Sequence, residues 1–292
     1  MIPKKFDYRA PSSVSEAIAL LGENEGAKVL AGGQSLLPMM KLRLAAPSVI
    51  VDISALPGLS YIEDKGDYLA VGALTTHDSI ESDRLIKERF ALITDAVSGI
   101  GDQQVRNLGT IGGSACHADP AGDLPTALLV ADAQFVIEGR TGRRVVRARE
   151  FFLDFFTTAV GRDEMLTEVR LPNLPRGSAS AYTKHAVRHE GLAIAMVGVA
   201  LTFDNRNMCS EARIGVGAAG PTPLRVPSAE EYLTGKVVDE AAMSEVAARA
   251  AQEADPPQDV HGSREYRLGV IKALTKSSLR LARERAGMQG GR

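Results

Sequence analysis

The chain has 292 residues, of which 45% are apolar and 24% are charged, and its formal net charge is −2. This composition is typical of a globular protein with room for about two domains, and the charge gives no sign of a nucleic-acid-binding surface. Two cysteines, Cys116 and Cys209, are too few for a disulfide framework and favour a cytoplasmic location. We see no secretory signal and no run of about 18 apolar residues, and therefore expect no membrane span.

The first 57 residues predict a compact unit of alternating strands and helices. Ser13-Val14-Ser15-Glu16 is typical of a capping box, which starts a helix that ends near Gly22. A short strand over 28–31 leads into the first glycine segment, and a helix over 36–44 and a strand over 49–53 follow. This order places a helix N-terminus beside a glycine loop, where an anion binds well.

Residues 58–176 predict a second unit that mixes strands and helices. We expect helices over 76–100 and 125–131 and a core position for the aromatic cluster over 151–156. The strands that we expect cover residues 68–72, 134–138, 144–147 and 167–171. The proline- and glycine-rich residues 172–178 then predict a linker.

The last part of the chain predicts three strands followed by two helices, an α+β arrangement. The strands are expected over 180–185, 193–203 and 211–216, and the helices over 239–253 and 263–286. Residues 215–220 match the dinucleotide pattern G-x-G-x-x-G, but Pro221 and Pro223 follow at once and oppose the helix that the pattern needs. We therefore reject a nucleotide site there.

Two glycine segments carry the strongest functional signal. The first is Ala31-Gly32-Gly33-Gln34-Ser35, followed by Leu36, and the second is Thr110-Ile111-Gly112-Gly113-Ser114. Glycine pairs let backbone N–H groups approach and face a phosphate, although each pair alone is as easily a tight turn. Two such segments brought together by the fold suit a pyrophosphate, and so predict a dinucleotide.

Polar residues near the second segment are weaker candidates. Asp119 fits an Asp-Pro turn, whereas Asp123 precedes a helix and could accept hydroxyl groups of a sugar chain. Cys116 and His117 do not make a catalytic triad by sequence proximity alone, and no metal-ligand set is evident. Lys184 fits either a solvated strand edge or a contact with the bound ligand. We therefore expect no catalytic side chain and no metal.

These residues resemble the FAD-binding medium subunit of the molybdenum hydroxylases, the family of aerobic carbon monoxide dehydrogenases and xanthine dehydrogenases. The resemblance covers essentially the whole chain. It is carried by the two glycine segments, the second with its lead-in from Gln104, and by the motifs at residues 119–124, 164–172 and 262–267.

The resemblance implies a vanillyl-alcohol-oxidase/PCMH-like α+β fold. The FAD-binding domain would span residues 1–176, with subdomains 1–57 and 58–176, and a smaller α+β domain with an antiparallel sheet would span 177–286. It further implies that both glycine segments hold the FAD pyrophosphate and that Asp123 meets the sugar chain. The backbone at Met165 and Leu166 would lie against the flavin, and Lys184 would approach it.

The implied activity is electron transfer rather than substrate chemistry. Electrons would pass from a molybdenum–molybdopterin centre on a large partner subunit, through two [2Fe–2S] clusters on a small partner, to this FAD and an external acceptor. The acceptor is NAD, a quinone or oxygen, and a dimer of heterotrimers is expected. Gln34 stands where the carbon monoxide enzymes commonly carry histidine, which weakens the case for carbon monoxide as the substrate. Carbon monoxide, an aldehyde and an N-heterocycle all remain open. The iron–sulfur-containing benzoyl-CoA branch is excluded, because its cysteines are missing.

Two alternatives remain at this point. One is a stand-alone flavin oxidoreductase of the vanillyl-alcohol-oxidase-like superfamily, for which no substrate-side acid/base pair is evident. The other is a nucleotide-binding module without enzymatic activity.

Overall fold

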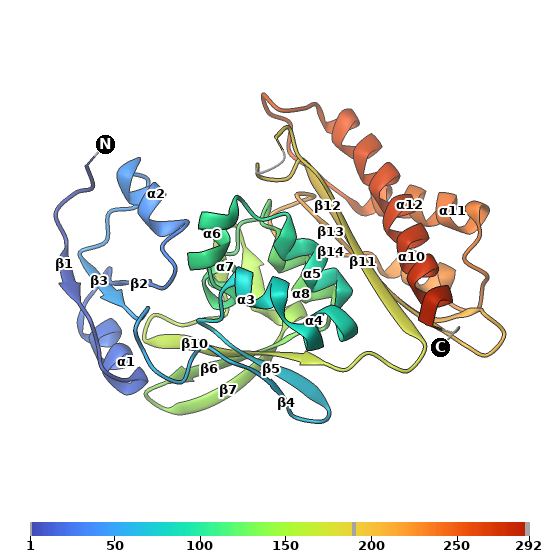
Figure 1. The fold of residues 1–292 in the computed structure, drawn as a ribbon. Helices are drawn as coiled ribbons and strands as arrows, with labels where there is room; N and C mark the ends of the chain where they lie inside the picture. Colours follow the sequence, from blue (N-terminus) through green and yellow to red (C-terminus); the bar gives the residue numbers. More distant parts are fainter. Residues whose placement is uncertain (1, 189–190, 290–292) are drawn as a thin grey trace.

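The computed structural model describes residues 2–188 and 191–289, which form three units in chain order. Figure 1 shows the N-terminal unit in blue at one end, a central unit in the middle and the C-terminal helices in orange and red at the other end. Each unit has one main sheet and one buried apolar cluster, and the central unit has a two-stranded sheet in addition.

The N-terminal unit is a small parallel sheet in the order β1-β3-β2 with two helices. Its elements are β1 (Asp7–Arg9), α1 (Val14–Glu23), β2 (Lys28–Leu30), α2 (Leu36–Lys41) and β3 (Val49–Asp52). Ser13 caps α1 by accepting from the Glu16 N–H at 3.2 Å, but the Glu16 carboxylate bonds Ser12 instead of returning to Ser13. The predicted capping box is therefore only half formed.

The central unit is built on an antiparallel sheet in the order β4-β5-β10-β6-β7. Its strands are β4 (Ile62–Asp64), β5 (Tyr68–Gly72), β6 (Gln134–Gly139), β7 (Gly142–Arg147) and β10 (Glu164–Pro172). A small hairpin of β8 (Phe152–Asp154) and β9 (Thr157–Thr158) lies beside it. In this hairpin region Phe151 and Phe152 are buried, but Phe155 and Phe156 are 56% and 52% exposed. The expectation of a wholly buried aromatic cluster was wrong, because the hairpin turns its tip to solvent.

Short helices cover this sheet. They are α3 (His77–Ser82), α4 (Arg84–Arg89), α5 (Ala91–Ser98), α6 (Gln103–Leu108), α7 (Ile111–His117), α8 (Asp123–Val130) and α9 (Ala148–Phe151). The helix predicted over 76–100 is three helices, because Asp83 ends α3 in extended conformation and caps α4, and Phe90 breaks the chain again. Helices α6, α7 and α9 and strands β1, β4, β8 and β9 were not predicted from the sequence.

The C-terminal unit has an antiparallel sheet in the order β11-β12-β13-β14. Two of its three helices pack on this sheet, and the third packs against those two helices. The elements of the unit are β11 (Ser178–His185), β12 (Ala195–Phe203), β13 (Cys209–Gly217), β14 (Leu224–Arg225), α10 (Pro227–Leu233), α11 (Glu240–Glu253) and α12 (Arg264–Gln289). The predicted three strands and two helices of this unit are present, and their ends differ by a few residues, whereas β14 and α10 were not predicted.

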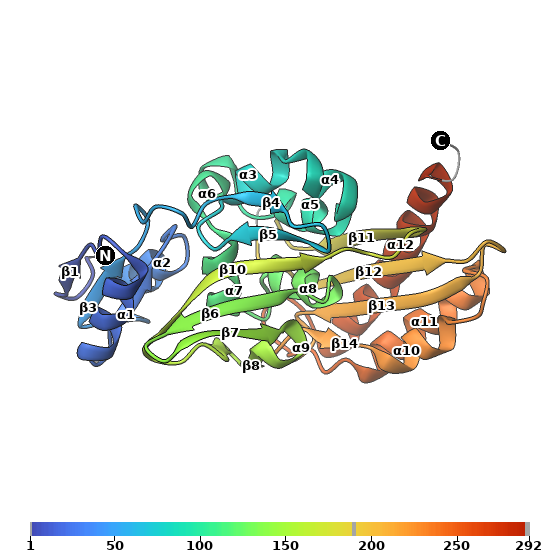
Figure 2. The same ribbon diagram turned by 90° about the horizontal axis from the view of Figure 1, so that it is seen from below.

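This last sheet is buried on both faces. Helices α5 and α8 of the central unit contact one face, and α10 and α12 contact the other (Figures 1 and 2). Neighbouring residues of one strand therefore join different cores: Tyr182 packs in the central cluster and Ala181 in the C-terminal cluster. The central and C-terminal units consequently share a continuous apolar interface rather than a loose linker.

Candidate functional site

The first glycine segment leaves its backbone donors free. None of the N–H groups of residues 32–35 donates a hydrogen bond to another described residue. Gly33 has φ +72°, a left-handed conformation that glycine adopts without steric cost. Successive free N–H groups in such a turn form a concave site that attracts anions.

The second glycine segment is arranged differently from the prediction. Thr110 is the N-cap of α7, and its side chain accepts from the Gly113 N–H at 3.0 Å. The N–H groups of Ile111 and Gly112 donate to the carbonyls of Thr75 and Ala73, and that of Ser114 donates to the Thr110 carbonyl. The expected outward N–H cradle is therefore absent here, because protein acceptors use these donors. What this segment presents instead is the Ser114 hydroxyl, which makes no hydrogen bond to a described residue.

The fold brings the two segments into contact. A Cβ added at Gly32 would lie 1.9 Å from the Leu108 carbonyl oxygen, and a Cβ at Gly113 would lie 3.8 Å from the Ala31 Cβ. Only a glycine at position 32 permits this approach. The free N–H groups of residues 32–35 and the hydroxyls of Ser35 and Ser114 thus belong to neighbouring segments, a donor set suited to phosphate oxygens.

Asp123 and Lys184 form a buried ion pair across two units. The Lys184 Nζ lies 2.8 Å from Asp123 Oδ2 and donates to the Gly99 carbonyl at 2.9 Å. The Tyr182 hydroxyl donates to the other carboxylate oxygen at 2.8 Å. Burial raises the pKa of Asp123, while the Lys184 charge and the Tyr182 hydrogen bond oppose that rise. Burial and the adjacent carboxylate raise the pKa of Tyr182 well above its ordinary value.

Tyr182 is a residue that the sequence analysis did not select. The signal available was its position two residues before Lys184, which places both side chains on the same face of β11. The spacing predicts that the two side chains share a face, but the sequence does not show that this face of β11 points toward Asp123.

The loop that carries Asp119 is fastened to the C-terminal unit. The Asp119 carboxylate accepts from the Ala121 N–H at 2.9 Å, which confirms the Asp-Pro turn. The Ala218 N–H donates to the Pro120 carbonyl at 2.8 Å, and the Ala193 N–H donates to the Ala121 carbonyl at 3.4 Å. Ala218 lies in the rejected G-x-G-x-x-G sequence, where no helix follows the strand. The glycine-rich segment at residues 215–220 therefore attaches the C-terminal unit to the loop that carries Asp119.

Apolar side chains line a cleft of 690 Å³ next to this loop. Its lining includes Asp119 and Pro120 on one side and Phe155 and Phe156 of the hairpin tip. The His117 ring lies 5.1 Å from the Phe156 ring. The exposed aromatic pair thus borders a cleft that reaches the turn at Asp119.

Met165 and Leu166 contribute their side chains to two cores. Met165 is buried in the N-terminal cluster and Leu166 in the central one. Both pair with β6, and the register shifts between Leu166 and Glu168. Their side chains are thus structural, and the predicted flavin contact would have to come from the backbone.

His77 packs against Gly109, directly before the second glycine segment. A Cβ at Gly109 would lie 2.8 Å from the His77 ring, and the His77 Nδ1 has no hydrogen-bond partner among the described residues. Burial, together with the Arg106 charge, lowers the pKa of His77 to about 4. This histidine is therefore neutral at pH 7.

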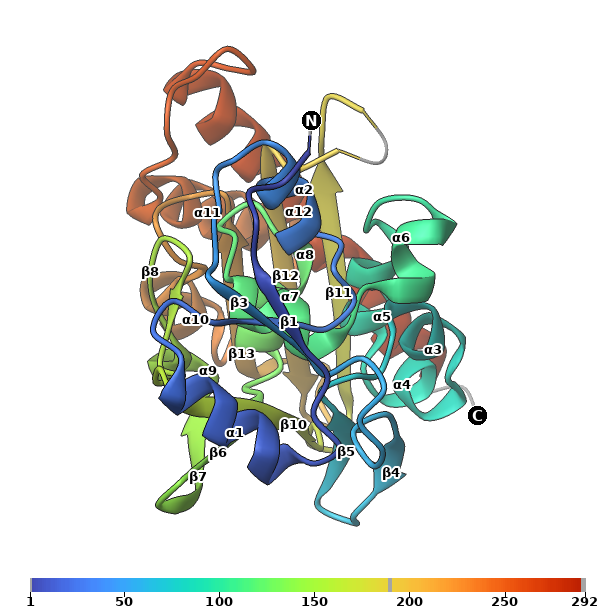
Figure 3. The ribbon, with the colours of Figure 1, turned by 90° about the vertical axis from the view of Figure 1, so that its left-hand side faces the viewer.

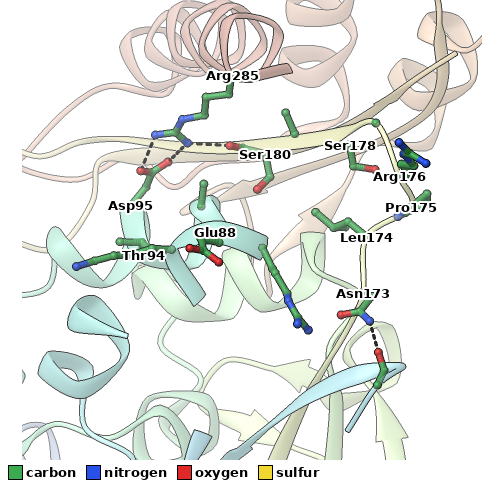
Figure 4. Close-up of a pocket in the computed structure, with 16 residues that line it drawn as sticks. Glu88, Thr94, Asp95, Asn173, Leu174, Pro175, Arg176, Ser178, Ser180 and Arg285 are labelled. Carbon is green, nitrogen blue, oxygen red and sulfur yellow. Dashed lines mark hydrogen bonds and ion pairs between the residues drawn. The ribbon is translucent and has the colours of Figure 1, made fainter. Parts of the chain in front are cut away.

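A second, polar cleft of 770 Å³ lies between the central and C-terminal units (Figure 4). In it the Arg285 guanidinium bonds both oxygens of Asp95 at 2.6 and 2.9 Å and the Ser180 carbonyl at 2.7 Å. The cleft thus contains an ion pair that ties α12 to α5.

Comparison with known proteins gives full-length matches. Residues 4–174 match the family described as the FAD binding domain in molybdopterin dehydrogenase, and residues 180–282 match the CO dehydrogenase flavoprotein C-terminal domain. The chain belongs to this family of FAD-binding medium subunits. Its membership confirms the predicted family, the fold class and the assignment to oxidoreductase subunits.

Individual relatives agree with this placement. The alpha subunit of the 6-hydroxypseudooxynicotine dehydrogenase complex of Paenarthrobacter nicotinovorans is 37% identical over 98% of this chain and 97% of its own length. The carbon monoxide dehydrogenase structure from Hydrogenophaga pseudoflava is 38% identical, with a TM-score of 0.93 over 97% of this chain and 98% of that one. Quinoline 2-oxidoreductase from Pseudomonas putida 86 is 32% identical, with a TM-score of 0.93 over 98% and 99% of the two chains.

Two kinds of feature are absent from the part of the chain that the structure describes. Within residues 2–188 and 191–289, no helix is long and apolar enough to cross a bilayer. The same ranges hold no group of three or more histidine, cysteine or acidic side chains placed to bind a metal.

Proposed function

We propose that the chain is the electron-transfer subunit of a molybdenum-containing hydroxylase and passes electrons from [2Fe–2S] clusters of a partner subunit to NAD, a quinone or oxygen. The observation that carries the proposal is the close approach of the two glycine segments, the first of which keeps its backbone N–H groups free of protein acceptors. Such a donor set suits the pyrophosphate of FAD.

The residues fit FAD in their chemistry. The N–H groups of Gly33, Gln34 and Ser35 would bind phosphate oxygens, with the Ser35 and Ser114 hydroxyls as further donors. The absence of a Cβ at Gly32 and Gly113 keeps this region open. The other residues of the two segments would shape the site without donating hydrogen bonds to the cofactor. They are Leu36, Thr110, Ile111 and Gly112.

The ion pair of Asp123 and Lys184 would orient the rest of the cofactor. Both side chains are almost fully buried, so their positions are fixed before a ligand arrives. Lys184 supplies a positive charge near Gly99, and Asp123 supplies acceptor oxygens for hydroxyl groups. Asp119 would act indirectly, by holding the turn that leads to Asp123. FAD, when bound, supplies the exchange of electrons, and the protein supplies its position and electrostatic surroundings.

The proposed partners and substrate rest on the names of the relatives. These relatives are named as medium chains or subunits of dehydrogenases of carbon monoxide, glyceraldehyde and 6-hydroxypseudooxynicotine. We propose a large molybdenum–molybdopterin subunit and a small subunit with two [2Fe–2S] clusters as partners, in a dimer of heterotrimers in the cytoplasm. The substrate would be carbon monoxide, an aldehyde or an N-heterocycle, selected on the large subunit. The domain boundary near residue 176 is part of the same proposal.

The test is reconstitution of the purified chain with FAD. We expect a yellow protein whose flavin absorbance is bleached by dithionite and restored by NAD⁺, a quinone or oxygen, without hydroxylation of any substrate. Co-purification with the partner subunits should yield molybdenum, iron and flavin together. A chain that stays colourless with FAD contradicts the proposal. Oxidation of a small substrate by the chain alone would favour a stand-alone flavin oxidoreductase, and nucleotide binding without flavin reduction would favour a non-enzymatic module.

A further inference from the structure

An exposed apolar and basic surface covers α2, the turn after it and the N-terminal arm of residues 2–6. We call it the α2 surface. Its apolar members are Ile2, Leu37, Leu42 and Leu44, with exposed fractions of 83%, 37%, 58% and 73%. The arm lies beside α2 in each of the three ribbon views, so the two segments form one face of the N-terminal unit (Figures 1, 2 and 3).

The charges of this surface have a single sign. Lys4, Lys5, Lys41 and Arg43 are exposed, and none of them forms an ion pair with another residue that the structure describes. Residues 2–6 and 36–46 contain no aspartate or glutamate, although the whole chain has 36 acidic and 34 basic residues. The α2 surface therefore differs in charge from the rest of the molecule.

The turn after α2 holds its side chains in a defined arrangement. The N–H groups of Leu42 and Leu44 donate to the Pro38 and Met39 carbonyls, both at 2.9 Å. Arg43 has φ +63°, a left-handed conformation that costs a non-glycine residue about 1 kcal/mol or more. An ordered surface loses less conformational entropy on association than a flexible one.

We propose that the α2 surface docks the partner subunit that donates electrons, through an apolar centre with an acidic rim on that partner. Unpaired cations around exposed leucines are complementary to such a face and would steer its approach. The surface also adjoins the candidate cofactor site, since α2 begins at Leu36, directly after Ser35. This proposal rests on the proposed function.

A protein partner fits better than a lipid surface. Helices that lie in a membrane interface need an extended apolar face, whereas α2 has six residues and the exposed leucines extend into the turn after it. The relatives, moreover, are named as subunits of multi-subunit enzymes.

The test compares variants of the full-length tagged chain, co-expressed with the molybdenum and iron–sulfur subunits of its complex. One variant carries Leu42→Asp and Leu44→Asp, and the other carries Lys4→Glu, Lys5→Glu and Lys41→Glu. Val260→Asp and Lys272→Glu are the controls, because both residues are exposed in the C-terminal unit. The readouts are the iron retained on the tagged chain and its FAD content.

We expect both variants to lower iron retention by about tenfold or more with FAD content unchanged, and the controls to match the wild type. Raising the salt concentration from about 50 to about 500 mM should lower the iron retained by the wild-type chain. The same change should have less effect on the iron that the charge variant still retains. Retention of iron by both variants at the wild-type level overturns the docking proposal alone. A wild-type chain that binds FAD and retains no partner contradicts the proposed function itself.

Lipid binding is tested separately with vesicles containing about 30% phosphatidylserine. We expect neither the wild type nor the charge variant to sediment with them. If the wild type sediments with the vesicles and the charge variant does not, the α2 surface binds a membrane and the proposal is overturned.

Discussion

At Gly32 the backbone of the first glycine segment packs against Leu108 and Gly109, which lead directly into the second segment, so this position tests the candidate site at the scale of one residue. In Gly32→Ala the new Cβ must displace the Leu108 carbonyl from 1.9 Å, which separates the two segments. We expect FAD affinity to fall by about tenfold or more, measured by flavin fluorescence titration. Gly269→Ala is the control, because nothing lies within 4 Å of its added Cβ. Equal FAD affinity in both variants would show that the contact is irrelevant to the cofactor.

The buried pair of Asp123 and Lys184 predicts a large stability effect. Asp123→Asn leaves the Lys184 charge buried without its counter-ion, and we expect a loss of about 3 kcal/mol in the free energy of unfolding at pH 7. Lys184→Met added to Asp123→Asn should recover most of that loss in urea titrations. Glu63→Gln, in the exposed pair with Lys65, should change stability by less than about 1 kcal/mol. Additive losses in the double variant would contradict the coupling.

His77 predicts how stability depends on pH. Its pKa in the folded chain is about 4, against about 6.5 when unfolded. As the pH falls, the unfolded chain takes up this proton at a higher pH than the folded chain does. The free energy of unfolding is therefore highest above about pH 6.5 and falls as the pH drops toward 4, by about 2 kcal/mol at pH 5. His77→Gln should remove this part of the pH dependence in urea titrations at pH 7.5 and 5. His261→Gln, at an exposed position, should retain it.

At the scale of elements, α12 is attached to α5 by Arg285. Arg285→Ala removes its bonds to Asp95 and the Ser180 carbonyl, and we expect a loss of about 1–3 kcal/mol. On the same helix Arg280 pairs with Glu240 in a largely exposed bridge, so Arg280→Ala should cost less than about 1 kcal/mol. Thermal unfolding of the two variants measures the difference, and equal shifts would contradict a specific role for the Asp95 contact.

Elements with a regular apolar pattern were predictable from the sequence, and those defined by tertiary contact were not. Strands such as β3 and β12 show runs of branched apolar residues, and α11 has a clear cap at Asp239. Helix α7 was missed because it begins with a glycine pair, which disfavours helix in isolation. Its first turn is held by the carbonyls of Thr75 and Ala73, from a distant segment. For the same reason the sequence indicated the two glycine segments but not which of them keeps its N–H groups free.

At the scale of the molecule, the sheet β11–β14 belongs to two cores at once. A fragment of residues 177–292 would expose the face that α5 and α8 cover, and a fragment of residues 1–176 would expose those helices in turn. We expect each fragment to bind a hydrophobic dye such as ANS, and the central and C-terminal units of the full chain to unfold in one transition. Two well-separated transitions in calorimetry, with dye-free fragments, would contradict this.

The bond from the Ala218 amide to the Pro120 carbonyl links the C-terminal unit to the turn that leads into Asp123. A ligand held by Asp123 would therefore stabilise a contact between units as well as its own site. We expect saturation with FAD to slow hydrogen exchange at the Ala218 amide, although this amide lies outside both glycine segments.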